Sequence, residues 1–540
     1  MSSIPKPTNE PIRNYEPGSE EKASLKEKLA ELSQKQIEIP LIIGGKEVHT
    51  GDTSTCVMPH NHGHVLATFH QAGEQEVYQA IESAQAAWKQ WSTTPLNERA
   101  AIFLKMAELL TGPYRDIINA STMLNMSKNV FQAEIDAACE LIDFWNFNCW
   151  FAQELYNHQP MYSPDPTKNS MEHRSLEGFV FAVTPFNFTS IAANLPSAPA
   201  LMGNVAIWKP ASSAVYPAYF IMQLFKEAGL PDGVINFVPG RGSVVGPLVM
   251  DHPDLAGVHF TGSTAVFQNM WKHIGRNIKQ YKSYPRIVGE TGGKDFCIAH
   301  DSVNKEALVT AMVRGAFEFQ GQKCSAMSRA YIPSSIWSDI ENNLLKEMNT
   351  ITMGDPNDFS NFMNAVIDKN AFDSIKEFID DAANAEDAEI IFGGNCDDSV
   401  GYFIEPTIII TQNPKFRTMC EEIFGPVLTI YLYDPSKWKD TLELVDSTSP
   451  YALTGCVMAN DSNAIAEASS SLKHAAGNFY INDKPTGAVV GQQPFGGSRA
   501  SGTNDKAGSM FNLARWVSQR TVKENFDPPT DYRYPFLDEN

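Results

Sequence analysis

Hydrophobic and polar positions change their spacing along the chain. Between residues 73 and 157, apolar residues recur every three or four positions, as at Val77, Ile81 and Ala84, which predicts amphipathic helices. From residue 179 to about 295, short apolar runs alternate with helical stretches, and a second alternation of the same kind follows. Strands that alternate with helices form parallel sheets with helices on both faces. The pattern therefore predicts an α/β fold with two successive α/β units.

Each unit has its own set of predicted strands. In the first unit they cover residues 179–183, 205–208, 234–238, 258–260 and 286–289. In the second unit they cover residues 329–332, 388–392, 427–432, 453–458 and 478–481. Glycine and proline pairs such as Gly425-Pro426 separate these elements, as expected for loops.

Polar or glycine residues follow four of the predicted strands in the first unit. Asn187, Lys209, Gly262 and Glu290 each lie just after the carboxyl end of a strand. The carboxyl ends of parallel strands open on one edge of the sheet, where ligands bind. Gly262 and Ser263 also open a predicted helix, whose backbone N–H groups suit a pyrophosphate. Each residue alone would be an ordinary turn residue, but together they predict one crevice.

One cysteine lies in a distinctive loop. Cys324 follows a stretch rich in glycine and glutamine, Phe319 to Lys323, between a predicted helix and a predicted strand. A thiolate is a strong nucleophile where its surroundings favour ionisation. A single cysteine is more often a small buried apolar residue. A catalytic role for Cys324 therefore needs support from the rest of the chain. The eight cysteines form no CxxC pair and no metal-ligand spacing, which predicts free thiols and no metal site.

The overall charge argues against some classes of partner. The chain has 540 residues and a formal net charge of −21, whereas nucleic acids and anionic membranes bind basic surfaces. No run of about 18 apolar residues predicts a membrane span, and the first residues lack the apolar core of a signal peptide. The expected location is the cytoplasm if the source is bacterial and the mitochondrial matrix if it is eukaryotic.

The candidate chemical residues lie within motifs that span most of the chain. In order, these motifs are TPFNF (184–188), WKP (208–210), FTGST (260–264), ETGGK (290–294), GQKC (321–324), EEIFGPV (421–427) and PFGG (494–497). Together they make the chain resemble the aldehyde dehydrogenase superfamily. The resemblance implies a Rossmann-like cofactor domain (1–157 and 179–295), a second α/β catalytic domain (296–485) and a small β oligomerisation element (158–178 and 505–540). It also implies a homodimer or a larger homo-oligomer.

Further motifs resemble one branch of that family. They are GNFYINDK (477–484) and GAVVGQQPF (487–495). Members of this branch use NAD to oxidise L-glutamate γ-semialdehyde, the open form of Δ1-pyrroline-5-carboxylate, to L-glutamate. This reaction is the second step of proline degradation, and the resemblance implies it for the chain. No proline dehydrogenase segment precedes the matching region, so a monofunctional form is expected.

The resemblance implies a chemical role for three residues. Cys324 attacks the aldehyde carbon, while the Asn187 amide and the Cys324 backbone N–H hold the oxyanion that forms. Hydride transfer to the nicotinamide leaves a thioester, which is hydrolysed by a water that Glu290 activates. A glutamate that acts as a base near neutral pH needs a raised pKa, so Glu290 is expected to be partly buried.

The resemblance also implies binding residues. The cofactor is expected to contact Pro185, Lys209, Gly262, Ser263, Glu422 and Phe424. The substrate is expected to contact Phe188, Ser325, Gly487, Ala488 and Phe495. Of the latter, Ser325 and the backbone N–H groups of Gly487 and Ala488 would meet the charged amino acid end of the substrate. Alternatively, Ser325 only forms hydrogen bonds within its own loop.

Two positions depart from the family pattern. Phe267 stands where many members have a glycine that lets the helix approach the pyrophosphate. Residues 209–213 read KPASS, without the carboxylate that NAD-specific members often use to bind the ribose 2′-OH. The branch favours NAD, and the missing carboxylate leaves NADP open as a second cofactor.

Three other hypotheses fit parts of the sequence. The first is another aldehyde dehydrogenase, such as one for succinate semialdehyde, which lacks the α-ammonium group. The second is a non-catalytic binding protein, which would not need Cys324, Glu290 and Asn187 together. The third is a cofactor-independent thiol hydrolase, which needs a histidine base. Its nearest candidates, His259 and His300, lie in no Cys-His signature.

Overall fold

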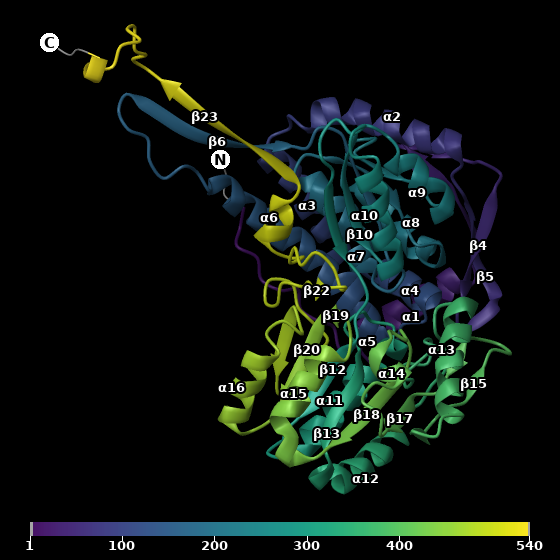
Figure 1. Ribbon diagram of the computed structural model, residues 1–540. Helices are drawn as coiled ribbons and strands as arrows, with labels where there is room; N and C mark the ends of the chain where they lie inside the picture. The colour runs from purple at the N-terminus through teal and green to yellow at the C-terminus, as the bar shows by residue number, and fades with distance from the viewer. Residues whose placement is uncertain (1–3, 538–540) are drawn as a thin grey trace.

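The computed structural model describes residues 4–537 and places the two predicted units in separate sheets (Figure 1). The first sheet has seven strands in the order β11-β10-β7-β8-β9-β2-β3. In that order they are Arg286–Glu290, Leu255–Thr261, Phe179–Val183, Val205–Lys209, Ile235–Phe237, Leu41–Ile43 and Lys46–Val48. Strands β7 to β11 are parallel, and β2 and β3 add an antiparallel edge. Each strand predicted for the first unit is confirmed to within three residues at either end.

The helices that connect these strands include one that the sequence pattern does not predict. They are α7 (Thr189–Leu201), α8 (Val215–Glu227), α9 (Gly242–Met250) and α10 (Thr264–Arg276). Helix α7 contains Pro196 and Pro199, which lack an N–H donor and disfavour a helix interior. Nearly every residue of α7 is buried, and it packs against β7 and β8. Tertiary burial therefore overrides the local signal.

The second sheet also has seven strands, in the order β14-β17-β18-β13-β12-β20-β21. In that order they are Ala388–Phe392, Thr407–Thr411, Val427–Tyr433, Met327–Pro333, Asp295–Ala299, Thr454–Met458 and Asn478–Ile481. The strand prediction missed β12 and β17, which both have neighbours on two sides and whose short apolar runs carry no periodicity. The accompanying helices are α11 (Lys305–Phe317), α12 (Trp337–Met348), α13 (Lys369–Ala383), α14 (Arg417–Cys420), α15 (Trp438–Ser447) and α16 (Ser462–Ser471).

The helical first part of the chain packs beside the first sheet. Its helices are α1 (Glu20–Ser33), α2 (Glu74–Trp91), α3 (Leu96–Thr111), α4 (Arg115–Met126), α5 (Val130–Ala133) and α6 (Leu141–Asn157). Between α5 and α6 lies a π-helix, η1 (Glu134–Glu140). Such widened turns are frequently found at functional sites. No helix within residues 4–537 is long and apolar enough to cross a membrane.

Smaller sheets complete the fold. Strands β1 (Ile37–Ile39), β5 (Asn61–His70) and β4 (Thr53–Met58) form a three-stranded sheet. Two short pairs are β15 (Cys396–Asp397) with β16 (Phe403–Ile404), and β19 (Tyr451–Ala452) with β22 (Ser498–Arg499). After α17 (Met510–Ala514), strand β23 (Val517–Asn525) pairs antiparallel with β6 (Thr167–Ser175). Figure 1 shows β6 and β23 projecting from the body as an arm.

Candidate active site

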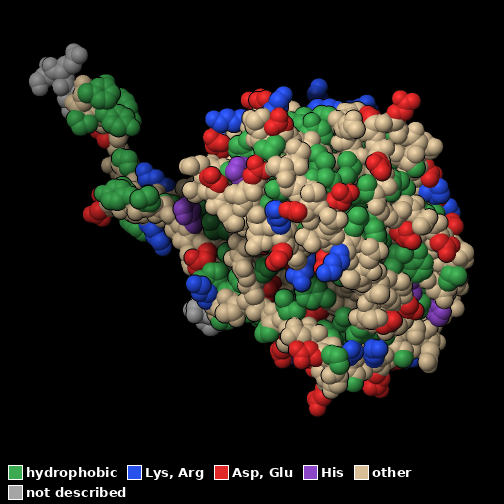
Figure 2. All heavy atoms as spheres, turned by 90° about the horizontal axis from the view of Figure 1, so that it is seen from below, with side chains coloured by type: hydrophobic (Ala, Val, Ile, Leu, Met, Phe, Trp, Pro, Cys, Tyr) green, Lys and Arg blue, Asp and Glu red, His purple; other side chains and the backbone are tan. Residues whose placement is uncertain are grey.

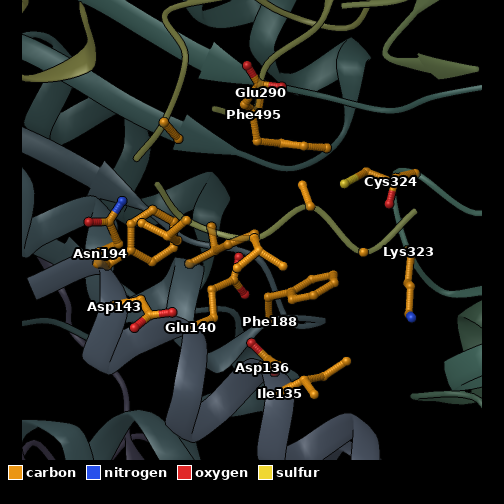
Figure 3. Close-up of a pocket in the computed structure, with 18 of the residues that line it drawn as sticks. Ile135, Asp136, Glu140, Asp143, Phe188, Asn194, Glu290, Lys323, Cys324 and Phe495 are labelled. Atoms are coloured by element: carbon orange, nitrogen blue, oxygen red, sulfur yellow. The ribbon is translucent and has the colours of Figure 1, made fainter. Parts of the chain in front are cut away.

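Two cavities meet at Cys324. The smaller has a volume of about 370 Å³ and is lined by Glu290, Ser325 and Phe495 among others, as Figure 3 shows in part. The larger has a volume of about 900 Å³ and includes Asn187. Cys324 lines both cavities. The sulfur therefore lies where a molecule in one cavity can react with a molecule in the other.

The loop before Cys324 has an unusual backbone. Phe319 and Gln320 both have φ near +50°, a left-handed conformation that non-glycine residues rarely adopt, and Gly321 follows with φ +65°. A side chain at Gly321 would place its Cβ 2.2 Å from the Gly425 carbonyl oxygen. The Gln320 amide nitrogen donates to the carbonyls of Ser127 and Ala365 at 2.9 Å each. These contacts hold the strained turn and thereby fix the position of the nucleophile.

The surroundings of Cys324 favour the thiol over the thiolate. Burial raises the pKa of Cys324 well above its ordinary value, and the carboxylates of Asp295, Glu290 and Glu422 raise it further. A nearby base that takes the proton would therefore assist formation of the reactive thiolate.

Glu290 lies at the carboxyl end of β11 and has the properties of such a base. Burial raises its pKa well above the ordinary range of a glutamate. Two features oppose this shift: the Gly497 backbone N–H donates to Glu290 Oε2 at 3.3 Å, and the Lys506 ammonium lies nearby. A carboxylate with a raised pKa binds a proton well near neutral pH, so Glu290 suits proton transfer with the Cys324 thiol or with water.

Asn187 lies against the loop that carries Cys324. Its side chain is buried, and Nδ2 donates to the Gln322 carbonyl at 3.0 Å. An amide nitrogen carries two N–H groups, so one bond to the loop still leaves Asn187 able to donate to an oxyanion beside Cys324.

The residues predicted to bind the cofactor gather around the larger cavity. They are Pro185, Lys209, Gly262, Ser263, Glu422 and Phe424. Burial lowers the pKa of Lys209 to about 8, and its ammonium donates to the Pro210 carbonyl at 3.0 Å. The Gly293 backbone N–H donates to Glu422 Oε1 at 2.8 Å, which fixes that carboxylate. A side chain at Gly292 would place its Cβ 2.2 Å from the Glu422 carboxylate.

These groups fit a dinucleotide. Gly262 and Ser263 precede α10, and the Ser263 hydroxyl caps that helix by accepting from the Val266 N–H at 3.4 Å. Backbone N–H groups at a helix start suit a pyrophosphate, while Lys209 and Glu422 offer a donor and an acceptor for ribose hydroxyls. The cavity of about 900 Å³ has the size of a cofactor site.

Phe267, the departure noted in the sequence, does not block this cavity. Its ring is buried and stacks on Phe260 at a centroid distance of 5.4 Å. The ring fills the space above Gly289, where an added Cβ would lie 2.2 Å from it. The bulky ring of Phe267 is therefore accommodated because the residue of β11 that faces it, Gly289, has no side chain.

The residues predicted to contact the substrate line the smaller cavity. They are Phe188, Ser325, Gly487, Ala488 and Phe495. The Ser325 hydroxyl is hydrogen-bonded to the Thr486 hydroxyl at 2.7 Å. Ser325 thus joins the nucleophile loop to the loop of residues 484–493, rather than bonding only within its own loop.

Sequence reasoning missed a row of acidic residues across the cavity. Asp136, Glu140 and Asp143 come from the π-helix and the start of α6, and they line the smaller cavity opposite Cys324 (Figure 3). Asp136 forms a buried ion pair with Lys128 at 2.6 Å. Burial raises the pKa of Asp143 to about 6. The spacing of four and three residues between these acids places them on one helix face, and it is the signal that could have indicated them.

Basic groups lie toward the nucleophile. Lys323 and Lys484 line the same cavity, and Lys323 forms an ion pair with Glu318 at 3.0 Å. Lys484 donates to the Thr486 carbonyl at 2.9 Å. The cavity therefore presents both signs of charge around apolar walls.

Comparisons with known proteins agree with this geometry. A family model described as the aldehyde dehydrogenase family matches residues 47–522. The chain therefore belongs to the aldehyde dehydrogenase family.

Its relatives carry a narrower name. The mitochondrial delta-1-pyrroline-5-carboxylate dehydrogenase of Dictyostelium discoideum is 53% identical over 99% of this chain and 96% of its own length. The protein of the same name from Homo sapiens is 48% identical over 98% of this chain and 94% of its own length. The crystal structure of the Delta-pyrroline-5-carboxylate dehydrogenase from Mycobacterium tuberculosis bound with NAD is 48% identical, has a TM-score of 0.96 and covers 99% of each chain.

Proposed function

We propose that the chain oxidises L-glutamate γ-semialdehyde, formed from Δ1-pyrroline-5-carboxylate, to L-glutamate with NAD as electron acceptor. The names of the full-length relatives support this substrate, and the structure bound with NAD supports the cofactor. The observation that carries the proposal is that Cys324 lines both cavities, next to the raised-pKa carboxyl of Glu290.

The proposed reaction begins at Cys324. The sulfur attacks the aldehyde carbon, its proton passes to a base, and the Asn187 amide with the Cys324 backbone N–H holds the oxyanion. NAD, when bound, supplies the acceptor for the hydride that leaves this carbon. Glu290 then takes a proton from the water that hydrolyses the Cys324 thioester, which releases the carboxylic acid.

The amino acid end of the substrate suits the charges of the smaller cavity. The α-carboxylate would accept from Ser325 and from the N–H groups of Gly487 and Ala488, with positive charge at Lys323 and Lys484 close by. The α-ammonium would face the acidic row formed by Asp136, Glu140 and Asp143. Phe188 and Phe495 would pack on the short aliphatic chain.

The test is NADH formation with pyrroline-5-carboxylate, measured on the wild type and on Cys324→Ala. We expect the variant to lose at least about 10³-fold in kcat because the covalent route is removed. Equal or greater wild-type activity on succinate semialdehyde would contradict the proposed substrate, but it would not affect the assignment to the aldehyde dehydrogenase family. A Cys324→Ala variant with full activity would contradict the proposed nucleophile.

The proposal extends to the architecture and the assembly. We propose a cofactor domain at residues 1–157 and 179–295, a catalytic domain at 296–485, and an oligomerisation element at 158–178 and 505–540. The arm of β6 and β23 and the exposed aromatic residues beyond it support a homodimer or a larger homo-oligomer. The proposed location is the cytoplasm for a bacterial source and the mitochondrial matrix for a eukaryotic one.

A further inference from the structure

A segment without regular structure runs along the smaller cavity. Residues 4–17, here called the N-terminal strap, precede α1 and include Asn9, Glu10 and Ile12 in the cavity lining. The cavity that holds Cys324 and Glu290 is therefore closed on one side by residues that lie far from them in the sequence.

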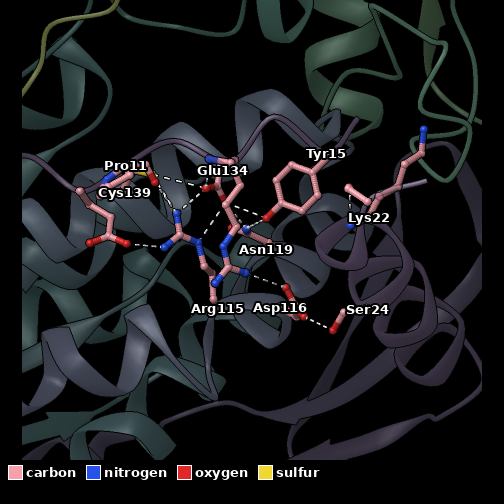
Figure 4. A network of polar contacts seen from close by, with 12 residues as sticks. Pro11, Tyr15, Lys22, Ser24, Arg115, Asp116, Asn119, Glu134 and Cys139 are labelled. Atoms are coloured by element: carbon pink, nitrogen blue, oxygen red, sulfur yellow. Dashed lines mark hydrogen bonds and ion pairs between the residues drawn. The ribbon is translucent and has the colours of Figure 1, made fainter. Parts of the chain in front are cut away.

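The strap is fixed by a buried polar network (Figure 4). Glu134 of the π-helix accepts from the Arg13 backbone N–H at 2.9 Å and from the Tyr15 hydroxyl at 2.8 Å. Arg115 of α4 forms ion pairs with Glu134 and Glu10 and donates to the Pro11 carbonyl at 3.0 Å. Buried charges need such partners, so the strap is part of the folded body.

Asn9 connects the strap to two sides of the cavity at once. Its Nδ2 donates to Asp143 Oδ2 and to the Val490 carbonyl, each at 2.8 Å. Its Oδ1 accepts from Gln492 Nε2 at 2.9 Å. The Glu10 backbone N–H donates to the other oxygen of Asp143 at 2.8 Å. One side chain thus joins Asp143, at the start of α6, to the loop of residues 484–493.

We infer that Asn9 is a positioning residue for the amino acid end of the substrate. It holds Asp143 in place and, through Val490 and Gln492, the loop of residues 484–493, which includes Gly487 and Ala488. This inference rests on the proposed function, in which that loop and the acidic row receive the charged groups. It predicts that Asn9 governs the binding of an aldehyde with an α-amino acid group. The chemistry at Cys324 and the binding of NAD do not depend on it.

The experiment compares two aldehydes on each variant. One is L-glutamate γ-semialdehyde, and the other is propanal, which has an aldehyde but no amino acid end. We expect Asn9→Ala, and Asn9→Asp of the same shape, to raise KM for the semialdehyde about tenfold. The kcat, the KM for NAD and the kcat/KM for propanal stay within about twofold of wild type, since an intact fold and intact chemistry leave them unchanged.

Two further variants sharpen the result. Gln492→Ala removes the donor to Asn9 Oδ1 and shifts KM for the semialdehyde in the same direction. The matched control is Asn14→Ala, which changes an exposed asparagine on the same strap. It should leave the KM for the semialdehyde and the kcat/KM for propanal unchanged. An unchanged KM for the semialdehyde, or an equal loss on both aldehydes, would overturn the inference. Failure of the proposed function would show separately, as a wild type that does not prefer the semialdehyde to propanal.

Discussion

Single residues in this site owe their chemistry to their surroundings. Glu290 is a carboxyl group, yet burial raises its pKa, while Lys506 and the Gly497 N–H oppose the shift. Asp505 acts in the other direction and raises that pKa. Lys506 is itself held by the carbonyls of Gly477 and Gly496 at 2.8 and 3.0 Å. The protonation of the base is therefore set by groups that the sequence places more than two hundred residues away.

Removing the charge of Lys506 should move the pH dependence of the reaction. The cation lowers the pKa of Glu290, so in Lys506→Met that pKa rises and a smaller fraction of Glu290 is ionised at neutral pH. We expect kcat to fall roughly tenfold at neutral pH and to recover as the pH is raised.

The pH profile of kcat for Lys506→Met, beside Lys506→Arg, checks this expectation. Arginine keeps the charge and should keep the wild-type profile. A profile that stays in place in Lys506→Met would show that this cation does not control the base.

At the scale of elements, the nucleophile depends on a turn that its own residues disfavour. Phe319 and Gln320 adopt left-handed backbone angles that propensity does not predict. The Gln320 side chain makes three hydrogen bonds: two donated to carbonyls, and one accepted by Oε1 from the Asn364 N–H at 3.1 Å. The sequence shows that Gln320 lies in the loop before Cys324. The backbone groups that form hydrogen bonds with its side chain, however, lie in other segments of the chain.

Replacing Gln320 with alanine should weaken both the fold and the reaction. Three buried backbone groups would lose their partner, which lowers the free energy of unfolding by about 1–3 kcal/mol. The turn would relax, so kcat should fall about tenfold or more because Cys324 is misplaced.

Chemical denaturation and steady-state kinetics measure the two effects on Gln320→Ala. Gln280→Ala, which changes an exposed glutamine, is the matched control and should stay within about 0.5 kcal/mol of wild type. A loss of stability without a loss of kcat would mean that the turn does not position the nucleophile.

At the scale of the whole molecule, the segment that follows the arm has no partner within residues 4–537 that covers its aromatic side chains. Beyond β23, Tyr532, Tyr534 and Phe536 are 85%, 67% and 74% exposed. Figure 2 shows hydrophobic side chains gathered on this projecting part, away from the body. Large exposed apolar groups on a projection favour association with another copy.

Changing these aromatic residues should therefore alter the assembly. We expect Tyr534→Ser/Phe536→Ser to shift the protein toward monomers, as measured by sedimentation velocity over a range of concentrations. Tyr78→Ser, which changes an exposed tyrosine on α2, should leave the mass unchanged. A wild type that sediments as a monomer at every concentration would contradict the proposed oligomer.

The sequence by itself determined the α/β class and the family, and it predicted the residues for the chemistry. It could do so because strand and helix periodicities are local and because Cys324, Glu290 and Asn187 lie in contiguous motifs. Helix α7 was not predictable, since its burial outweighs the local effect of two prolines. Strands β12 and β17 were missed because short buried apolar runs show no strand periodicity. Only the tertiary structure brought Asn9, Asp143 and Val490 together and raised the pKa of Glu290. Contacts across hundreds of residues, and the exclusion of water from a cavity, depend on packing rather than on any local pattern.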